Sequence, residues 1–242
     1  MSHGEATREV ELLSPDAMRS TPTVYLFVPL TQQMANIRRW NRERGWGFTA
    51  AELSAVDLTP AYYADPLVVD VIAVYLPDGN GMDGVRRTCH ELWTVAAGRQ
   101  GSSWSWDWFM DRWKGHPKPV RLLAGIEHRP GVRRVTLDLA AHATPGSYLR
   151  PDRVRGKNSA HAEVLAAAAH FPKWIRAMDG TTVPFTFLAG YQVTLPERSV
   201  QHRLPFLSWS GFRRTLSLTA DFAYHGHLGW ASPVVRTAAA PA

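Results

Sequence analysis

The sequence predicts an α+β fold in which a mixed or antiparallel sheet packs with three to four helices. Short apolar runs rich in β-branched residues, above all Leu67 to Leu76, have the length and composition of buried strands. Segments with apolar residues at helical spacing alternate with them. The C-terminal third alternates polar and apolar residues, which predicts mainly antiparallel strands, with an enclosed cavity as one outcome.

We expect a single domain over residues 22–236 of the 242, because no repeat and no long linker divides this part of the chain. We expect residues 1–21 to form a flexible arm and residues 237–242 a disordered tail. No apolar run approaches the roughly 18 to 20 residues of a membrane helix, and the polar start is unlike a secretory signal. We therefore expect a cytoplasmic protein that does not bind a membrane.

The composition excludes several classes of site. Cys89 is the only cysteine, so an internal disulfide or a site with two thiolates is excluded. The net charge is +6, with 23 Arg and 4 Lys, but the Arg pairs are spread along the chain. This pattern favours a GC-rich coding bias over a nucleic-acid surface, which would gather charge on one face. No P-loop or dinucleotide motif is present, and we expect no cofactor.

The first half of the chain predicts two strands and three helices. Apolar runs predict strands, periodic stripes predict helices, and Thr49 with Glu52 has the spacing of a capping box. Thr31 is the expected N-cap of the first helix, and Gly98 the expected end of the third. In order, the expected elements are a strand at 24–28, a helix at 31–44, a short helix at 49–56, the strand at 67–76 and a helix at 82–97.

The second half predicts more strand than helix. Residues 120–126 and 132–139 flank a turn at 128–131 and predict a hairpin. Ser159 is the expected cap of an Ala-rich helix that is interrupted at Pro172 and resumes to Met178. The remaining expected elements are a loop at 140–157 and strands at 183–195, 213–222 and 223–230.

Asp70 is the first candidate catalytic residue because it is a lone carboxylate within the most apolar strand. A desolvated carboxylate with a raised pKa could act as a general acid or base, and the alternative is an ion pair with an arginine. Glu91 is the second candidate and His90 its neighbour. Both fall off the apolar stripe of their helix, so they are solvated unless the tryptophan-rich segment covers them.

Trp104, Trp106 and Trp108 lie in a segment with four tryptophans in ten residues. They are candidates for binding an aromatic substrate, and a hydrophobic plug or a homodimer contact are the alternatives. On the C-terminal strands, hydroxyl, amide and imidazole groups replace the Lys and Glu typical of a solvated face. Gln192, Asp221, His225 and His227 are therefore candidates for binding a polar ligand, and metal binding by the last three is one alternative. The other alternative is a short exposed sheet whose threonines reflect β-propensity alone.

His161 and Glu163 match the H-x-E spacing of zinc deaminases. Those enzymes also need two cysteines downstream, and no cysteine follows Cys89. We interpret the match as coincidence and His161 as a histidine at the edge of the core.

The leading hypothesis is a cofactor-independent enzyme of secondary metabolism that acts on an indole-like or other aromatic molecule. Carboxylate acid/base chemistry would suit a Pictet-Spengler-type condensation or cyclisation, which needs proton transfer and substrate burial. The alternative is a basic module that binds nucleic acid through Arg pairs and Trp stacking. A structural protein with the tryptophans at a subunit interface is the third class.

Overall fold

The computed structural model describes residues 26–105, 120–144, 147–194, 202–222 and 224–236. Helices combine with antiparallel and mixed sheets, which confirms the α+β class. The expected arm and tail lie outside these residues. The expected first strand is wrong in its described part, because Leu26 to Val28 form no strand. Their apolar side chains pack on the core without strand pairing, and the ring of Phe27 lies 5.0 Å from that of Phe171.

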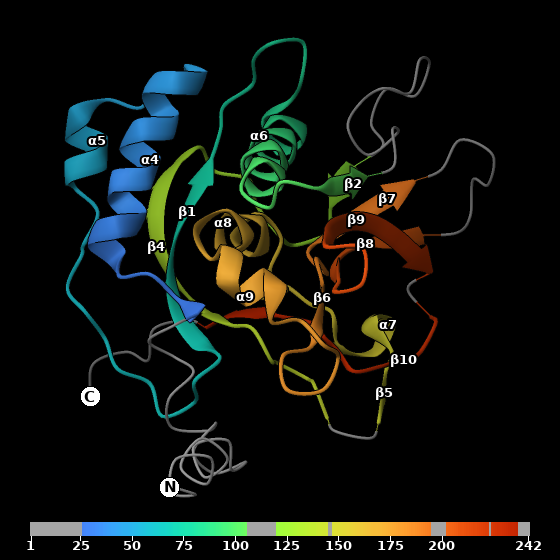
Figure 1. Ribbon diagram of the computed structural model, residues 1–242. Helices are drawn as coiled ribbons and strands as arrows, with labels where there is room; N and C mark the ends of the chain where they lie inside the picture. Colours follow the sequence, from blue (N-terminus) through green and yellow to red (C-terminus); the bar gives the residue numbers. More distant parts are fainter. Residues whose placement is uncertain (1–25, 106–119, 145–146, 195–201, 223, 237–242) are drawn as a thin grey trace, which may run out of the picture.

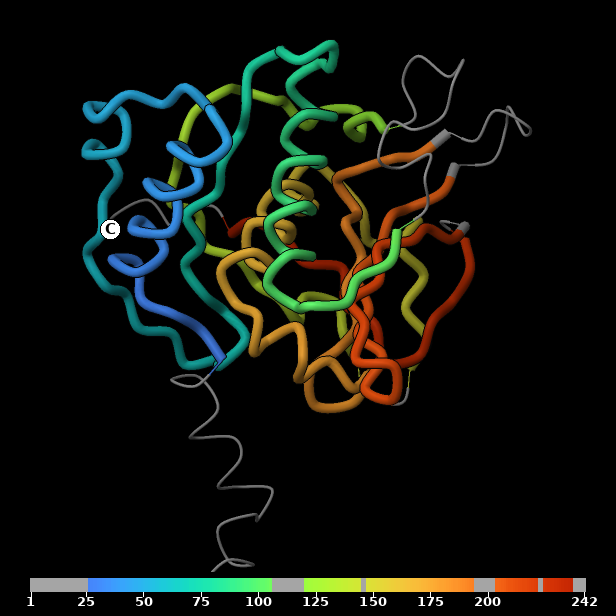
Figure 2. The backbone as a smooth tube through the Cα atoms, turned by 45° about the horizontal axis from the view of Figure 1, so that its top comes forward, coloured from blue at the N-terminus to red at the C-terminus, as the bar shows by residue number. Residues whose placement is uncertain are grey.

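The described elements stack in four layers (Figure 1). Two helices cover one face of a three-stranded antiparallel sheet, and three further helices lie between that sheet and a larger one. Figure 2 shows the same order, from the blue N-terminal helices to the orange and red strands on the opposite side. The first two layers are α4 (Leu30–Arg44) with α5 (Ala50–Ser54), then the sheet β1 (Val68–Tyr75), β4 (Gly131–Asp138) and β12 (Val234–Arg236). The third layer is α6 (Gly84–Gly98), α8 (Ala162–His170) and α9 (Pro172–Arg176).

The larger sheet is mixed, and its described strands close no barrel. Its main path is β11 (Trp230–Ala231), β6 (Phe185–Phe187), β8 (His202–Ser210), β7 (Tyr191–Thr194) and β3 (Val120–Leu122). β8 also pairs with β9 (Thr215–Phe222), and β9 in turn pairs with β2 (Ser103–Ser105). A separate two-stranded ladder joins β5 (Tyr148–Leu149) to β10 (His227–Leu228), and α7 (Pro151–Val154) follows β5.

The expected hairpin over 120–139 is wrong. β3 pairs with β7 in the larger sheet, whereas β4 pairs with β1 in the smaller one. The expected long strand over 183–195 is also wrong, because residues 188–190 form a turn that separates β6 from β7. A Cβ at Gly190 would lie 2.5 Å from the carbonyl oxygen of Ser159, so only glycine allows this turn to approach the chain before α8.

Local signals set the helix ends. The Thr49 capping box is present with both of its reciprocal bonds, and α4 stops at Gly45 in the left-handed conformation. Asp83 caps α6 by accepting from the amide of Arg86 at 2.9 Å. Every residue of α8 is buried, and its alanines allow close packing between the two sheets.

Backbone groups on the free edge of β1 form hydrogen bonds with side chains instead of with another strand. The Gln33 side chain donates to the carbonyl of Asp70 at 3.0 Å and accepts from the amide of Ile72 at 2.8 Å. The carbonyl of Ile72 also lies 3.1 Å from Nε2 of His170. Unpaired backbone groups on a buried edge are costly, so these two side chains allow β1 to end the sheet beneath α4.

Within the described residues, no helix combines the length and apolar character that spanning a membrane requires.

Candidate functional site

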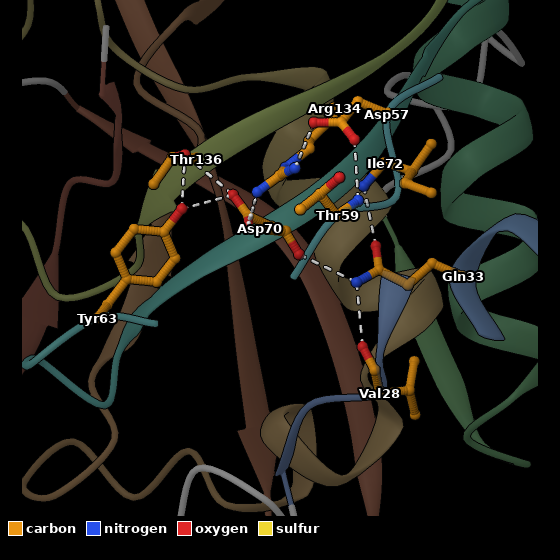
Figure 3. Close-up of polar contacts among 9 residues, drawn as sticks. All are labelled: Val28, Gln33, Asp57, Thr59, Tyr63, Asp70, Ile72, Arg134 and Thr136. Atoms are coloured by element: carbon orange, nitrogen blue, oxygen red, sulfur yellow. Dashed lines mark hydrogen bonds and ion pairs between the residues drawn. The ribbon is translucent and has the colours of Figure 1, made fainter. Parts of the chain in front are cut away.

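Asp70 faces an arginine, as the alternative interpretation of the sequence required. Its Oδ2 lies 2.7 Å from Nη2 of Arg134 on β4 (Figure 3). Its Oδ1 accepts from Tyr63 at 2.7 Å and from Thr136 at 3.0 Å. The side chain is only 7% exposed, so the guanidinium and two hydroxyls replace water around it. A carboxylate held in this way is suited to stability, and its catalytic role stays a prediction.

Glu91 is buried by residues of α4 and of the turn after it. Arg44, at the end of α4, donates to Oε2 of Glu91, and Nε1 of Trp46 lies 3.1 Å from the same oxygen. Nδ1 of His90 lies 3.8 Å from Oε1. Burial opposes ionisation of Glu91, but these partners lower its pKa to about 2. The cover therefore comes from α4 and the turn after it, and Glu91 is already ionised near neutral pH.

The predicted aromatic platform is only partly within the described residues. Trp106 and Trp108 lie outside them. Trp104 is in β2, is 49% exposed and pairs in register with Ser217 of β9. Gln192 is half-buried in β7, which β8 separates from β9. Trp104 and Gln192 thus belong to the larger sheet, whereas Asp70 belongs to the smaller sheet and Glu91 to α6.

Asp221, His225 and His227 do come together. Nδ1 of His225 lies 3.0 Å from Oδ1 of Asp221, and Nε2 of His227 lies 3.2 Å from Oδ2. One ligand atom from each residue can be chosen so that all three lie within 4.8 Å of one another. The strand parity that suggested this group assumed one continuous strand, whereas the chain leaves β9 and returns as β10. The imidazoles meet the carboxylate across that turn.

The chain around β10 holds His227 in place. His227 pairs in register with Leu149, and its ring lies 5.4 Å from Phe187 and 5.1 Å from Trp230. This burial lowers the pKa of His227, although Asp221 acts to raise it. A neutral imidazole beside a carboxylate is the form that ligates a metal ion.

Three exposed apolar side chains lie on β10, on its partner strand β5 and in the turn before β10. Tyr148, Tyr224 and Leu228 are three of the six large hydrophobic side chains that are exposed among the described residues. Leu228 and Tyr148 are Cα partners between β10 and β5, and the ring of Tyr224 lies 4.8 Å from that of His225. We call these three residues the corner patch. Asp221 and His225 are partly exposed, and Tyr224 is the patch residue whose ring lies next to His225.

Two chemistries fit this arrangement. Two imidazoles and one carboxylate are a donor set for Zn²⁺ or Fe²⁺. In the absence of a metal, a carboxylate at Nδ1 of His225 would orient the ring and favour proton transfer through the other nitrogen.

A second polar group, formed by Tyr75, His161 and Glu163, is buried in the core. Tyr75 of β1 donates to Oε1 of Glu163, and Nδ1 of His161 lies 3.0 Å from Oε2. Burial opposes ionisation of Glu163, but His161 and Tyr75 lower its pKa to about 2. His161 and Glu163 are thus in contact and buried in the core, although the match to H-x-E was interpreted as coincidence and His161 was placed at the core edge. Tyr75 adds the link from β1 to α8, and no sequence signal connected it with them.

Comparisons with protein-family models, curated proteins and solved structures find no match to this chain.

Proposed function

We propose that the protein is an enzyme that acts on a small aromatic molecule at the corner patch. Asp221, His225 and His227 would hold a divalent transition-metal ion, and a water molecule on that ion would supply the acid/base chemistry. The observation that carries this proposal is the convergence of the three ligand atoms within 4.8 Å. Asp70 and Glu91 are set aside because each carboxylate already has an arginine partner.

The exposure of the side chains suggests which of them would bind the substrate and which would act on it. Tyr148, Tyr224 and Leu228 offer apolar surface to an aromatic ring, and the half-exposed His225 is next to that surface. A bound divalent metal supplies a Lewis acid and lowers the pKa of a coordinated water. The cofactor-independent scheme, in which the Asp221 and His225 pair transfers protons alone, is the rival for the same site.

The first experiment is titration of the full chain with Co²⁺, followed by visible absorption, and with Zn²⁺, followed by calorimetry. We expect one site, with Asp221→Asn and His227→Gln each weakening binding about a hundredfold. His142→Asn is the control because His142 is exposed outside this group and has a positive φ, which asparagine tolerates. Metal binding that survives both site substitutions would refute the metal centre.

The second experiment tests the substrate class. Trp230 is next to His227, so its fluorescence should respond when indole compounds bind. We expect Leu228→Ser and Tyr148→Ser to weaken indole binding and Tyr62→Ser, which is exposed outside the patch, to leave it unchanged. Indole binding without any metal binding would favour the cofactor-independent rival. Failure of both titrations would refute the proposed function.

A further inference from the structure

A second exposed group lies where the β8 and β9 hairpin turns. Ser210 and Thr215 are the closing pair, and Gly211 to Arg214 form the turn. Phe212 is 99% exposed, the highest value among the large hydrophobic side chains of the described residues. Arg213 and Arg214 follow it and are also exposed. The turn thus presents one aromatic ring and two guanidinium groups to solvent.

The backbone of this turn is fixed by local hydrogen bonds. The amide of Arg213 donates to Oγ of Ser210 at 3.2 Å, and Oγ1 of Thr215 donates to the carbonyl of Arg213 at 3.0 Å. Arg214 adopts a left-handed conformation with φ of 50°. A turn held in this way presents Phe212 with little backbone ordering left to occur on binding.

A second exposed aromatic residue belongs to the same end of the hairpin. Trp104 in β2 pairs in register with Ser217, two residues after Thr215. Oγ of Ser102 lies 3.0 Å from Oγ1 of Thr215, which ties β2 to the base of the turn. We call Phe212, Arg213, Arg214 and Trp104 the hairpin tip. Its turn is at the opposite end of β9 from Asp221, about 20 Å away along the strand.

These side chains have the chemistry that binds single-stranded nucleic acid. Aromatic rings stack on bases of any sequence, and arginines contact the intervening phosphates. Among the described residues, no ion pair includes Arg213 or Arg214, so both charges remain available for an anion. The net charge of +6 also attracts the negatively charged nucleic acid.

A membrane surface suits this tip less well. The tip presents two aromatic rings, one on the turn and one on β2, and no exposed large aliphatic side chain. Its pair of cations is arginine, whose planar fork matches phosphate and stacks on rings. We propose that the hairpin tip binds single-stranded nucleic acid, with Phe212 and Trp104 stacking on bases and Arg213 and Arg214 contacting phosphates. This activity is separate from the site at Asp221 and does not depend on it.

The test is fluorescence anisotropy of a short labelled oligothymidylate, titrated with the full chain over a series of salt concentrations. We expect Phe212→Ala to weaken binding about tenfold at fixed salt, with an unchanged salt slope. The double variant Arg213→Gln/Arg214→Gln should reduce the slope of log affinity against log salt by about 1.4. Both changes lie in an exposed turn, and circular dichroism checks that the fold is retained.

Two matched control variants test whether binding needs the hairpin tip itself or only some exposed arginine pair and some exposed aromatic ring. Arg38→Gln/Arg39→Gln removes another exposed arginine pair, on α4, and Tyr62→Ala removes another exposed ring. Both should leave affinity and slope unchanged. Absence of oligonucleotide binding at low salt, or equal losses in the controls, would overturn the proposal. Binding to phosphatidylserine vesicles that depends on Phe212, without oligonucleotide binding, would also overturn it in favour of a membrane surface.

Discussion

Arg134 neutralises Asp70 across two adjacent strands, with Nη2 of the guanidinium 2.7 Å from Oδ2 of the carboxylate. Ile72 is the register partner of Arg134 and Thr136 is that of Asp70, so the charged pair is diagonal in the ladder. Arg134 also reaches Asp57 at 2.9 Å, before β1. One arginine therefore joins β1, β4 and the chain that leads into the sheet.

Replacing Arg134 with methionine should destabilise the protein by about 2 to 3 kcal/mol, because the Asp70 carboxyl group would lose its cationic partner in a site with little water. The loss is smaller than for a fully buried pair, since Arg134 is partly exposed. Urea unfolding measures it, and Arg129→Met, at an exposed arginine, should cost under about 1 kcal/mol. Equal losses in the two variants would contradict this account of Asp70.

Gln33→Ala should cost about 3 kcal/mol, because the carbonyl of Asp70 and the amide of Ile72 would both lose their partner on the buried edge of β1. Gln32→Ala is the matched control, since Gln32 is exposed on the same helix. Hydrogen exchange should show faster exchange of the Ile72 amide in the first variant only. Protection that remains at wild-type level would mean that this edge is closed by other groups.

Stability should fall with acid from about pH 6.5, the ordinary pKa of histidine. Burial lowers the pKa of His170 to about 3, so below 6.5 the unfolded chain binds a proton that the folded chain does not. The loss from this group is at most about 1.4 kcal/mol per pH unit. Below about pH 4.5 Glu163 and Glu91 add to it, because both have folded pKa values near 2.

Urea unfolding at a series of pH values measures this slope. His128 has a pKa lowered by burial and contributes in the same direction, so His170→Gln should flatten the curve between pH 6.5 and 4.5 without abolishing the slope. An unchanged slope in that variant would show that His170 does not carry the effect.

Tyr75→Phe should destabilise the protein by about 1 to 3 kcal/mol, because Glu163 would lose a donor where water cannot replace it. The folded pKa of Glu163 should rise toward its ordinary value, so the part of the stability that is lost below about pH 4.5 should become smaller. Tyr148→Phe, at an exposed tyrosine, should change neither stability nor its loss in acid.

Local sequence signals predicted the elements that local chemistry determines. Thr49 and Glu52 cap a helix through contacts three residues apart, and the β-branched run at 67–76 forms a buried strand. The hairpin prediction failed because the turn at 128–131 looks the same whether or not the flanking strands pair. Their real partners, β7 and β1, are distant in the chain.

The candidate sites also differ in whether their residues are close together or far apart in the sequence. Asp221, His225 and His227 lie within seven residues of one another, so they come together although the continuous strand assumed for them is absent. The partners of Glu91 and Glu163 could not be found in this way. Arg44 is 47 residues from Glu91 and Tyr75 is 88 residues from Glu163, and no periodicity spans such separations.

β12 adds the third strand to the smaller sheet nearly a hundred residues after β4 ends. A chain emerging from the ribosome would therefore complete β1, β4 and the whole larger sheet while the outer edge of β4 still lacked its neighbour. During synthesis that open edge would be the place where a chaperone could bind or where two nascent chains could join.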